Sequence, residues 1–105
     1  MGIIALACYR PKIGKEKELN RLMRNHLKVL RKQNLVTGRD SIMMKAADGT
    51  IIEVFEWKSK TMLDKAHKNP AVLKMWSEYS KVCDYVPLRT LPETADLFAG
   101  FSPFK

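Results

Sequence analysis

The two histidines of this sequence are the side chains best suited to acid–base chemistry near neutral pH. His26 lies at the centre of an apolar helical stripe, where the spacing favours another leucine. It is either a core histidine with one satisfied hydrogen bond or a polar group that projects into a cavity. His67 lies at the edge of a second apolar arc, and it is either half-exposed or part of a pocket rim. The sequence leaves both pairs of alternatives open.

Three large aromatic side chains are expected on inward faces, namely Trp57, Trp76 and Tyr79. Aromatic residues at this spacing more often form core than a ligand cage, yet a buried indole N–H or phenol O–H still needs a hydrogen-bond partner. A pocket with a few polar groups would meet both requirements. The candidate pocket residues are therefore His26, Trp57, His67, Trp76 and Tyr79, and the sequence assigns a catalytic role to none of them.

No self-sufficient catalytic motif accompanies these candidates. Neither a Ser-His-Asp nor a Cys-His arrangement can be argued, no glycine-rich phosphate loop is present, and no His, Cys or Asp cluster has metal-ligand spacing. Glu53 and Glu56 have opposite parity on one expected strand, so one faces the helices and the other faces the open side of the sheet. They cannot form a paired-carboxylate site, and we expect neither a metal nor a cofactor.

Two helices would position the candidates, one over 15–33 and a second over 60–68 that restarts over 70–82. The first has a clear amphipathic period, with a narrow basic stripe opposite its apolar side. Ser59 can cap the second helix. Asn69-Pro70 then restarts this second helix, with Asn69 as N-cap and Pro70 as first helical residue.

The strands follow from apolar runs and turn residues. The first run is apolar without alternation, which is typical of a strand buried on both faces. Asp48-Gly49 between two apolar runs predicts a tight hairpin. Pro87 indicates an edge position for the last strand. The four strands expected are 3–9, 41–46, 50–57 and 85–91.

The resulting order, βαββαβ, predicts an α+β fold: a ferredoxin-like sandwich with a four-stranded antiparallel sheet and two helices on one face. We expect residues 1–105 to form a single domain, with a C-terminal extension from about residue 92. That extension should contain a helical turn over 93–98 and a tail whose Phe101 and Phe104 pack on the body or on a partner. The second face of strand 3–9 needs a cover, and a partner subunit of a homodimer is the simplest one.

The net charge of +8 is concentrated in one part of the chain. Residues 10–39 hold ten basic and two acidic residues, so the remainder is neutral. A solvated helix face and an anion-binding surface are both open. Nucleic acid is not favoured, because strand 50–57 lacks the glycine and aromatic pattern of RNA-binding sheets. The basic stripe consists of Lys17, Arg21, Arg24, Lys28 and Arg31.

Cys8 and Cys83 form no CxxC pair, and each lies in an apolar segment. We expect buried free thiols in a reducing compartment. No signal peptide and no apolar run near membrane-spanning length is apparent, so a cytoplasmic protein without membrane contact is expected.

Four segments of the chain resemble the antibiotic biosynthesis monooxygenase group of the dimeric α/β-barrel superfamily: YRPKIGKEKEL, QNLVT, IIEVFEWKS and AHKNPAVLKMW. The resemblance covers about residues 3–91. It implies a homodimer paired through its sheets, with a cavity between helices and sheet in each subunit. Members of that group oxidise polyketide-type aromatic rings with O2 and no cofactor, or degrade haem. The haem-degrading branch would place a helix Trp at Ala66 and a haem-ligating His at Trp76, and neither matches.

Two hypotheses follow from the sequence and this resemblance. The first is a cofactor-independent monooxygenase-like or small-molecule-binding homodimer whose aromatic-lined pocket takes a small aromatic ligand. The second is a non-catalytic dimeric binding or regulatory module whose basic helix, Lys17–Arg31, contacts an acidic partner or nucleic acid. The sequence names no substrate.

Overall fold

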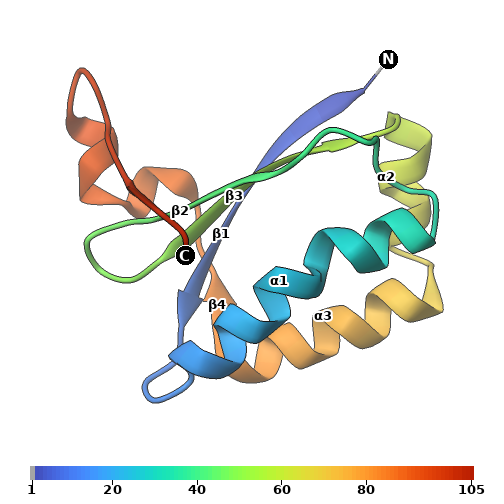
Figure 1. The fold of residues 1–105 in the computed structure, drawn as a ribbon, viewed down its shortest axis with the longest axis horizontal. Helices are drawn as coiled ribbons and strands as arrows, with labels where there is room; N and C mark the ends of the chain where they lie inside the picture. Colours follow the sequence, from blue (N-terminus) through green and yellow to red (C-terminus); the bar gives the residue numbers. More distant parts are fainter. Residues whose placement is uncertain (1) are drawn as a thin grey trace.

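The computed structural model describes residues 2–105. It confirms an α+β fold, with a five-stranded antiparallel sheet covered on one side by helices (Figure 1). The spatial order of the strands is β4-β1-β3-β2-β5. The strands are β1 (Ile3–Pro11), β2 (Ile42–Lys45), β3 (Ile51–Trp57), β4 (Cys83–Tyr85) and β5 (Ser102–Pro103). The helices are α1 (Glu16–Lys32), α2 (Lys60–Ala66) and α3 (Pro70–Val82).

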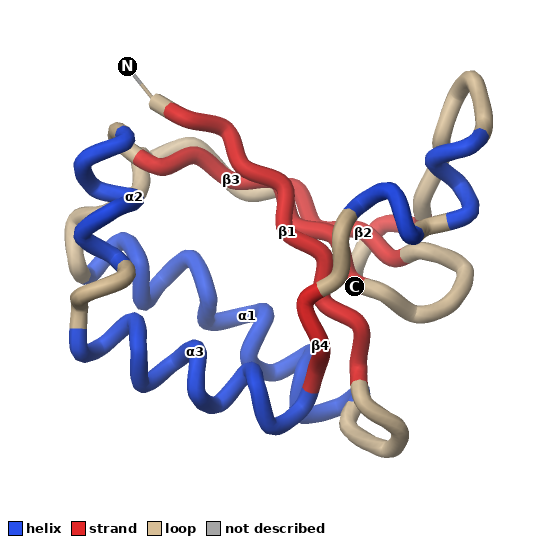
Figure 2. The backbone as a smooth tube through the Cα atoms, turned by 180° about the vertical axis from the view of Figure 1, so that it is seen from behind, coloured by secondary structure: helices blue, strands red, loops and turns tan. Residues whose placement is uncertain are grey.

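The two central strands, β1 and β3, determine which side chains face the helices. Ala5 pairs with Phe55 and Ala7 with Glu53, so these four residues lie on the same face, which we call the helix face. Alternate residues lie on the opposite face, which we call the far face. Figure 2 shows the helices on one side of the sheet and the C-terminal segment on the other.

The predicted hairpin joins β2 to β3. Gly49 has φ +91°, a conformation that glycine adopts without strain. The Asp48 carboxylate accepts a hydrogen bond of 2.8 Å from the Thr50 backbone N–H, which holds the turn. Because this turn sets the register, Ile51, Glu53, Phe55 and Trp57 all face the helices.

Local signals also place the helices. Buried Leu19, Met23 and Leu30 lie on the apolar side of α1. The Ser59 hydroxyl accepts from the Met62 N–H at 3.2 Å and caps α2. The Asn69 side chain accepts from two backbone N–H groups and caps α3, which begins with proline as expected. Figure 1 shows α1 and α3 antiparallel and side by side beneath the sheet.

The fourth strand is shorter and earlier than 85–91, which corrects the prediction. Strand β4 runs from Cys83 to Tyr85, and the Val86 N–H makes one more backbone bond, to the Cys8 carbonyl. Pro87 cannot donate a hydrogen bond, so the chain leaves the sheet there, at its edge. Two 3₁₀ turns follow, and the helical turn expected over 93–98 is limited to the second of them. These turns are Leu88–Thr90 and Pro92–Ala95.

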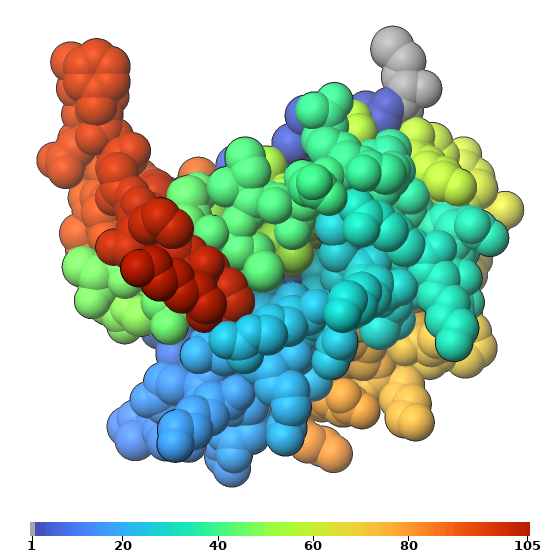
Figure 3. All heavy atoms as spheres, in the orientation of Figure 1, coloured from blue at the N-terminus to red at the C-terminus, as the bar shows by residue number. Residues whose placement is uncertain are grey.

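The tail adds a fifth strand, so the expectation of four strands is wrong. Strand β5 pairs with β2 at the other edge of the sheet (Figure 3, red tail against green hairpin). Leu91 and Phe101 pack on the far face over Cys8 and Ile52. The chain therefore covers part of that face itself. Ile4 and Leu6 of β1 are still 60% and 54% exposed.

Both cysteines are buried free thiols, as the sequence predicts. Burial raises the pKa of Cys83 to about 11 and also raises that of Cys8. Both thiols are therefore weak nucleophiles at neutral pH. No helix within residues 2–105 has the length and apolar character needed to cross a bilayer.

Candidate functional site

A cavity of about 370 Å³ lies between the helix face and the helices. Its walls come from both central strands, from all three helices and from β4, so it exists only in the folded chain. Four of the five candidate residues line it, namely His26, Trp57, His67 and Trp76. The small side chains of Ala5 and Ala7 on β1 leave the space that the cavity occupies. The other lining residues are Tyr9, Phe55, Leu63 and Tyr85.

A buried contact between a histidine and a glutamate supports the wall of this cavity. His26 Nδ1 lies 2.7 Å from Glu53 Oε1, and both side chains are almost inaccessible to solvent, at 4% and 1%. An imidazole lone pair and a carboxylate oxygen would repel each other at this separation, so we expect one of the two facing atoms to carry a proton. Nδ1 makes no hydrogen bond of good geometry, so the contact is a close electrostatic one.

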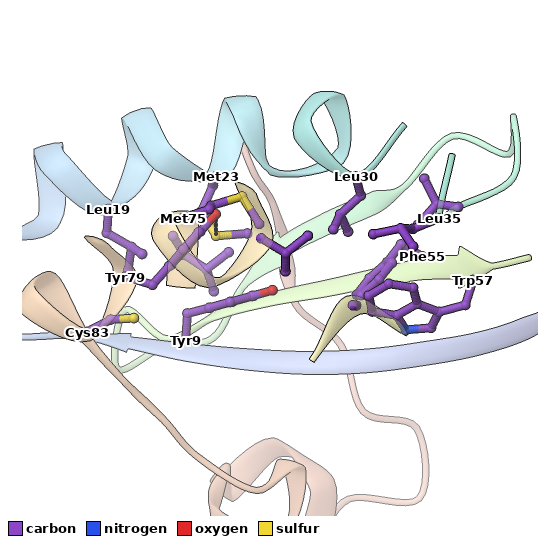
Figure 4. Packing of buried hydrophobic residues seen from close by; sticks show 14 of the residues in the cluster. Tyr9, Leu19, Met23, Leu30, Leu35, Phe55, Trp57, Met75, Tyr79 and Cys83 are labelled. Atoms are coloured by element: carbon purple, nitrogen blue, oxygen red, sulfur yellow. Dashed lines mark hydrogen bonds between the residues drawn. The ribbon is translucent and has the colours of Figure 1, made fainter. Parts of the chain in front are cut away.

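Tyr9 completes the polar group. Its hydroxyl donates to the same Glu53 oxygen at 3.3 Å. Burial, and next the negative charge of Glu53, raise the pKa of Tyr9 well above its ordinary value, so the phenol remains a proton donor. In Figure 4, Tyr9 points from β1 along the sheet toward Phe55 and Trp57.

One buried oxygen of this group has no partner. Glu53 Oε2 makes no hydrogen bond within residues 2–105 although Glu53 is fully buried. A buried polar atom without a partner destabilises a fold, by about 1–3 kcal/mol in typical cases. Such groups are found at functional sites, among other places. The pair is therefore a candidate acid–base group at the wall of the cavity.

Aromatic rings hold the histidine in place. The His26 ring meets Phe55 edge-on at a centroid distance of 5.3 Å and 87°, and it meets Tyr79 at 5.7 Å and 84°. The His26 ring borders the cavity, and Glu53 lies against its other nitrogen, Nδ1. Nε2 is therefore the nitrogen left for a bound molecule.

The rim of the cavity is formed where α2 meets α3. His67 is exposed, and its Nδ1 lies 3.1 Å from the Leu63 carbonyl oxygen. Its ring packs against Trp76 at 5.2 Å. His67 is therefore an exposed residue that also lines the rim, which combines the two alternatives the sequence leaves open.

Tyr79 differs from the other candidates because it does not line the cavity. It is fully buried behind the wall, where its hydroxyl donates to the Met23 sulfur at 3.6 Å. Burial, followed by the charge of Glu53, raises the pKa of Tyr79 far above its ordinary value. Tyr79 supports the His26 ring from behind.

Glu53 and Tyr9 are not among the pocket residues that the sequence predicts. Parity showed that one of two glutamates on β3 faces the helices, but it did not show which partner it meets. Two features of the sequence could have indicated the contact between Glu53 and His26. Glu53 shares its strand face with Phe55 and Trp57, and His26 lies on the inward side of α1. Two polar residues on facing apolar surfaces indicate a pair.

The basic stripe does not form one uniform surface. The Arg24 guanidinium donates to the Lys105 carbonyl at 3.2 Å and lies 5.5 Å from the Phe104 ring centre, so it holds the tail. Arg31 donates to the Arg39 carbonyl at 3.0 Å, so it holds the loop after α1. The remaining three stripe residues are exposed and make no side-chain contact of this kind within residues 2–105. The stripe as predicted consists of Lys17, Arg21, Arg24, Lys28 and Arg31.

The described residues, 2–105, contain no group of three or more His, Cys, Asp or Glu side chains that could hold a metal ion. The polar groups at the cavity include the His26–Glu53–Tyr9 group, and most of its walls are aromatic.

Comparison with known proteins supports the fold. No family model matches the chain, and no curated protein matches it. Among solved structures, the chain is similar to the structure of Rv0793 from Mycobacterium tuberculosis, with a TM-score of 0.66. The two are 16% identical, and the match covers 82% of this chain and 89% of that one. At this level of identity the similarity concerns the fold alone.

Proposed function

We propose that this protein binds a small, neutral, planar aromatic molecule in the cavity and oxidises it with O2 without a cofactor. The observation that carries the proposal is the sealed His26–Glu53 pair at the wall of an apolar cavity. The resemblance of four sequence segments to cofactor-independent monooxygenases of the dimeric α/β-barrel superfamily agrees with it.

The pair supplies the base that such chemistry requires. Glu53 holds the proton of His26 at Nδ1, so Nε2 can accept a proton from a phenol or enol in the cavity. The resulting imidazolium is stabilised by the buried carboxylate 2.7 Å away. Tyr9 remains hydrogen-bonded to Glu53 and keeps that carboxylate oriented toward His26.

The oxidation balances without any other reactant. Loss of the phenolic proton to His26 gives an electron-rich phenolate, whose ring carbon para to the oxygen bonds to O2. The peroxide anion that forms takes the proton back from His26, and the ring hydroperoxide then loses water and leaves a quinone, so one oxygen atom enters the product and the other leaves as water. The apolar walls exclude bulk water and keep the phenolate reactive.

The cavity lining indicates the charge of the ligand. None of the ten lining residues is Lys, Arg, Asp or Glu, and the nearest buried charge is the carboxylate of Glu53. A carboxylated ring would lose its hydration with no cation to replace it. Phenols and quinols without an acidic substituent are therefore the expected class.

Two subunits are part of the proposal. Ile4, Leu6 and Ile42 are more than half exposed on the far face, beside the part that the tail covers. Pairing of two far faces would bury them, so we propose a homodimer of ferredoxin-like βαββαβ sandwiches, each with β5 added at its edge.

The test uses 1-naphthol, with 1-hydroxy-2-naphthoate as the charged control. The only two tryptophans, Trp57 and Trp76, both line the cavity, so their fluorescence reports occupancy, and calorimetry gives the affinity. We expect 1-naphthol to bind, the naphthoate to bind at least about tenfold more weakly, and 1,4-naphthoquinone to form with uptake of O2.

The variant His26→Gln separates binding from chemistry. It should bind 1-naphthol within about threefold of wild type and form quinone about 100-fold more slowly, because it lacks a base. The rim control His67→Gln should change the rate little. If 1-naphthol binds without uptake of O2, the oxidation is ruled out. If neither 1-naphthol nor 1-hydroxy-2-naphthoate binds, the cavity is ruled out as a ligand site.

A further inference from the structure

A second hollow lies on the outer side of the helix layer, away from the cavity. It is a groove of about 450 Å³ between α1 and α3, which run antiparallel (Figure 1). Its apolar floor includes Leu22 and Val29 of α1 and Met75 of α3. Met75 enters this groove while the next residue, Trp76, enters the cavity, so the two hollows use different sides of α3.

Three lysines border this groove. Lys28 and Lys32 stand one turn apart on α1, and Lys74 faces them from α3. All three are exposed, and none makes a salt bridge or side-chain hydrogen bond within residues 2–105. The single carboxylate at the groove is Glu78. Three unpaired lysines therefore stand beside the apolar floor of the groove.

We propose that this groove binds an acidic amphipathic helix of a partner protein. Its apolar side chains would enter between α1 and α3, and its carboxylates would meet Lys28, Lys32 and Lys74. The surface from Leu22 to Lys32 is about 15 Å long, which matches about three turns of a helix.

The arrangement favours a helix over other anions. The lysines lie on both helices that border the groove and are spaced along its length. They therefore match carboxylates spaced along the two sides of a bound helix rather than one compact anion. The phosphate backbone of a nucleic acid would not use the apolar floor of the groove. A lipid surface would contact the most exposed side chains of the two helices rather than the groove between them. The proposal does not depend on the oxidation.

The experiment uses a fluorescein-labelled peptide of about 18 residues, a length at which an isolated helix begins to form. Leucines on one face are flanked by glutamates, and a scrambled peptide of the same composition is the control. Fluorescence anisotropy should show micromolar binding of the amphipathic peptide and at least about tenfold weaker binding of the scrambled one.

Two charge-reversed variants locate the contact. The groove variant Lys28→Glu, Lys32→Glu, Lys74→Glu should bind the peptide at least about tenfold more weakly. The matched variant Lys17→Glu, Arg21→Glu, Lys81→Glu reverses as many charges on the same two helices, and it should stay within about twofold of wild type.

Wild-type protein provides a readout that does not depend on variants. The peptide should shift the NMR amide signals of Val29, Ala71 and Met75 more than those of Ala5 and Ala7 in the cavity. Equal binding of the scrambled peptide, or an equal loss in the matched variant, would overturn the proposal. So would binding to phosphatidylglycerol vesicles or a DNA duplex without binding to the peptide.

Discussion

Glu53 and Glu56 lie three residues apart on β3, and the sheet places them in opposite surroundings. Glu53 faces the helices, is sealed from water and meets His26 at 2.7 Å. Glu56 faces away and is held by Arg39 at 3.1 Å and by the Thr37 hydroxyl at 2.9 Å.

The face on which a carboxylate lies decides its surroundings. Hydrogen bonds from Arg39 and then Thr37 lower the pKa of Glu56, so this carboxylate is neutralised by its neighbours at the surface. The contact between Glu53 and His26 is not screened by solvent, and Glu53 Oε2 has no hydrogen-bond partner within residues 2–105. An identical side chain is therefore held by a cation on one face and buried against a histidine on the other.

The largest effect is expected from Glu53→Ala. It leaves His26 and the Tyr9 hydroxyl buried without a partner, so the free energy of unfolding should fall by about 3 kcal/mol. Urea denaturation followed by circular dichroism measures it. The double variant His26→Leu, Glu53→Leu should recover most of the loss, because an apolar pair needs no compensation. A double variant as unstable as the single one would contradict the interpretation of His26 and Glu53 as a mutually dependent polar pair.

The far face is tested by Leu6→Glu. Leu6 is 54% exposed in the single chain, so this variant should fold normally. In a dimer paired through the far faces it would bury a carboxylate, and dimer dissociation should become about 100-fold easier. Sedimentation equilibrium measures the mass, with Leu97→Glu on the exposed tail as control. An unchanged mass would exclude this interface.

High pH should weaken the helix face. An unfolded tyrosine loses its proton near pH 10, whereas burial raises the pKa of Tyr9 and Tyr79 far above that in the folded state. The unfolded chain then binds fewer protons, so the free energy of unfolding should fall above pH 10 by about 1.4 kcal/mol per pH unit for each of the two.

Absorbance at 295 nm measures the ionisation of the tyrosines directly. Among the three tyrosines, Tyr85 is half exposed and the least buried, so it should ionise first as the pH is raised. Tyr85→Phe should remove that first step and leave a native state that shows no further tyrosinate until it unfolds. Early ionisation in this variant would show that Tyr9 or Tyr79 is open to solvent.

The smallest effect is expected on the far face at low pH. Because the pKa of Glu56 is lowered by folding, its contribution is present above the ordinary glutamate pKa and is lost as pH falls through the lowered value. Arg39→Ala should raise the pKa of Glu56 in an NMR titration and shift the melting temperature only slightly. A shift as large as that of Glu53→Ala would remove the contrast between the two faces.

Much of the fold was predictable because local chemistry decides it. The turn at Asp48-Gly49 and the caps at Ser59 and Asn69 are all set by neighbouring backbone. The tail was not predictable, because β5 forms by pairing with β2 far away in the sequence, and Pro87 ends β4 earlier than its apolar residues suggest.

The candidate site shows the same division. Periodicity alone placed His26 and Trp57 on inward faces, because each side chain's direction follows from its own helix or strand. Only the packing of α1 over β3 decided that His26 meets Glu53, that Tyr9 joins them, and that Tyr79 lies behind the cavity rather than in it. These contacts join residues up to 56 positions apart, and their distances depend on how the layers stack, which no local pattern specifies.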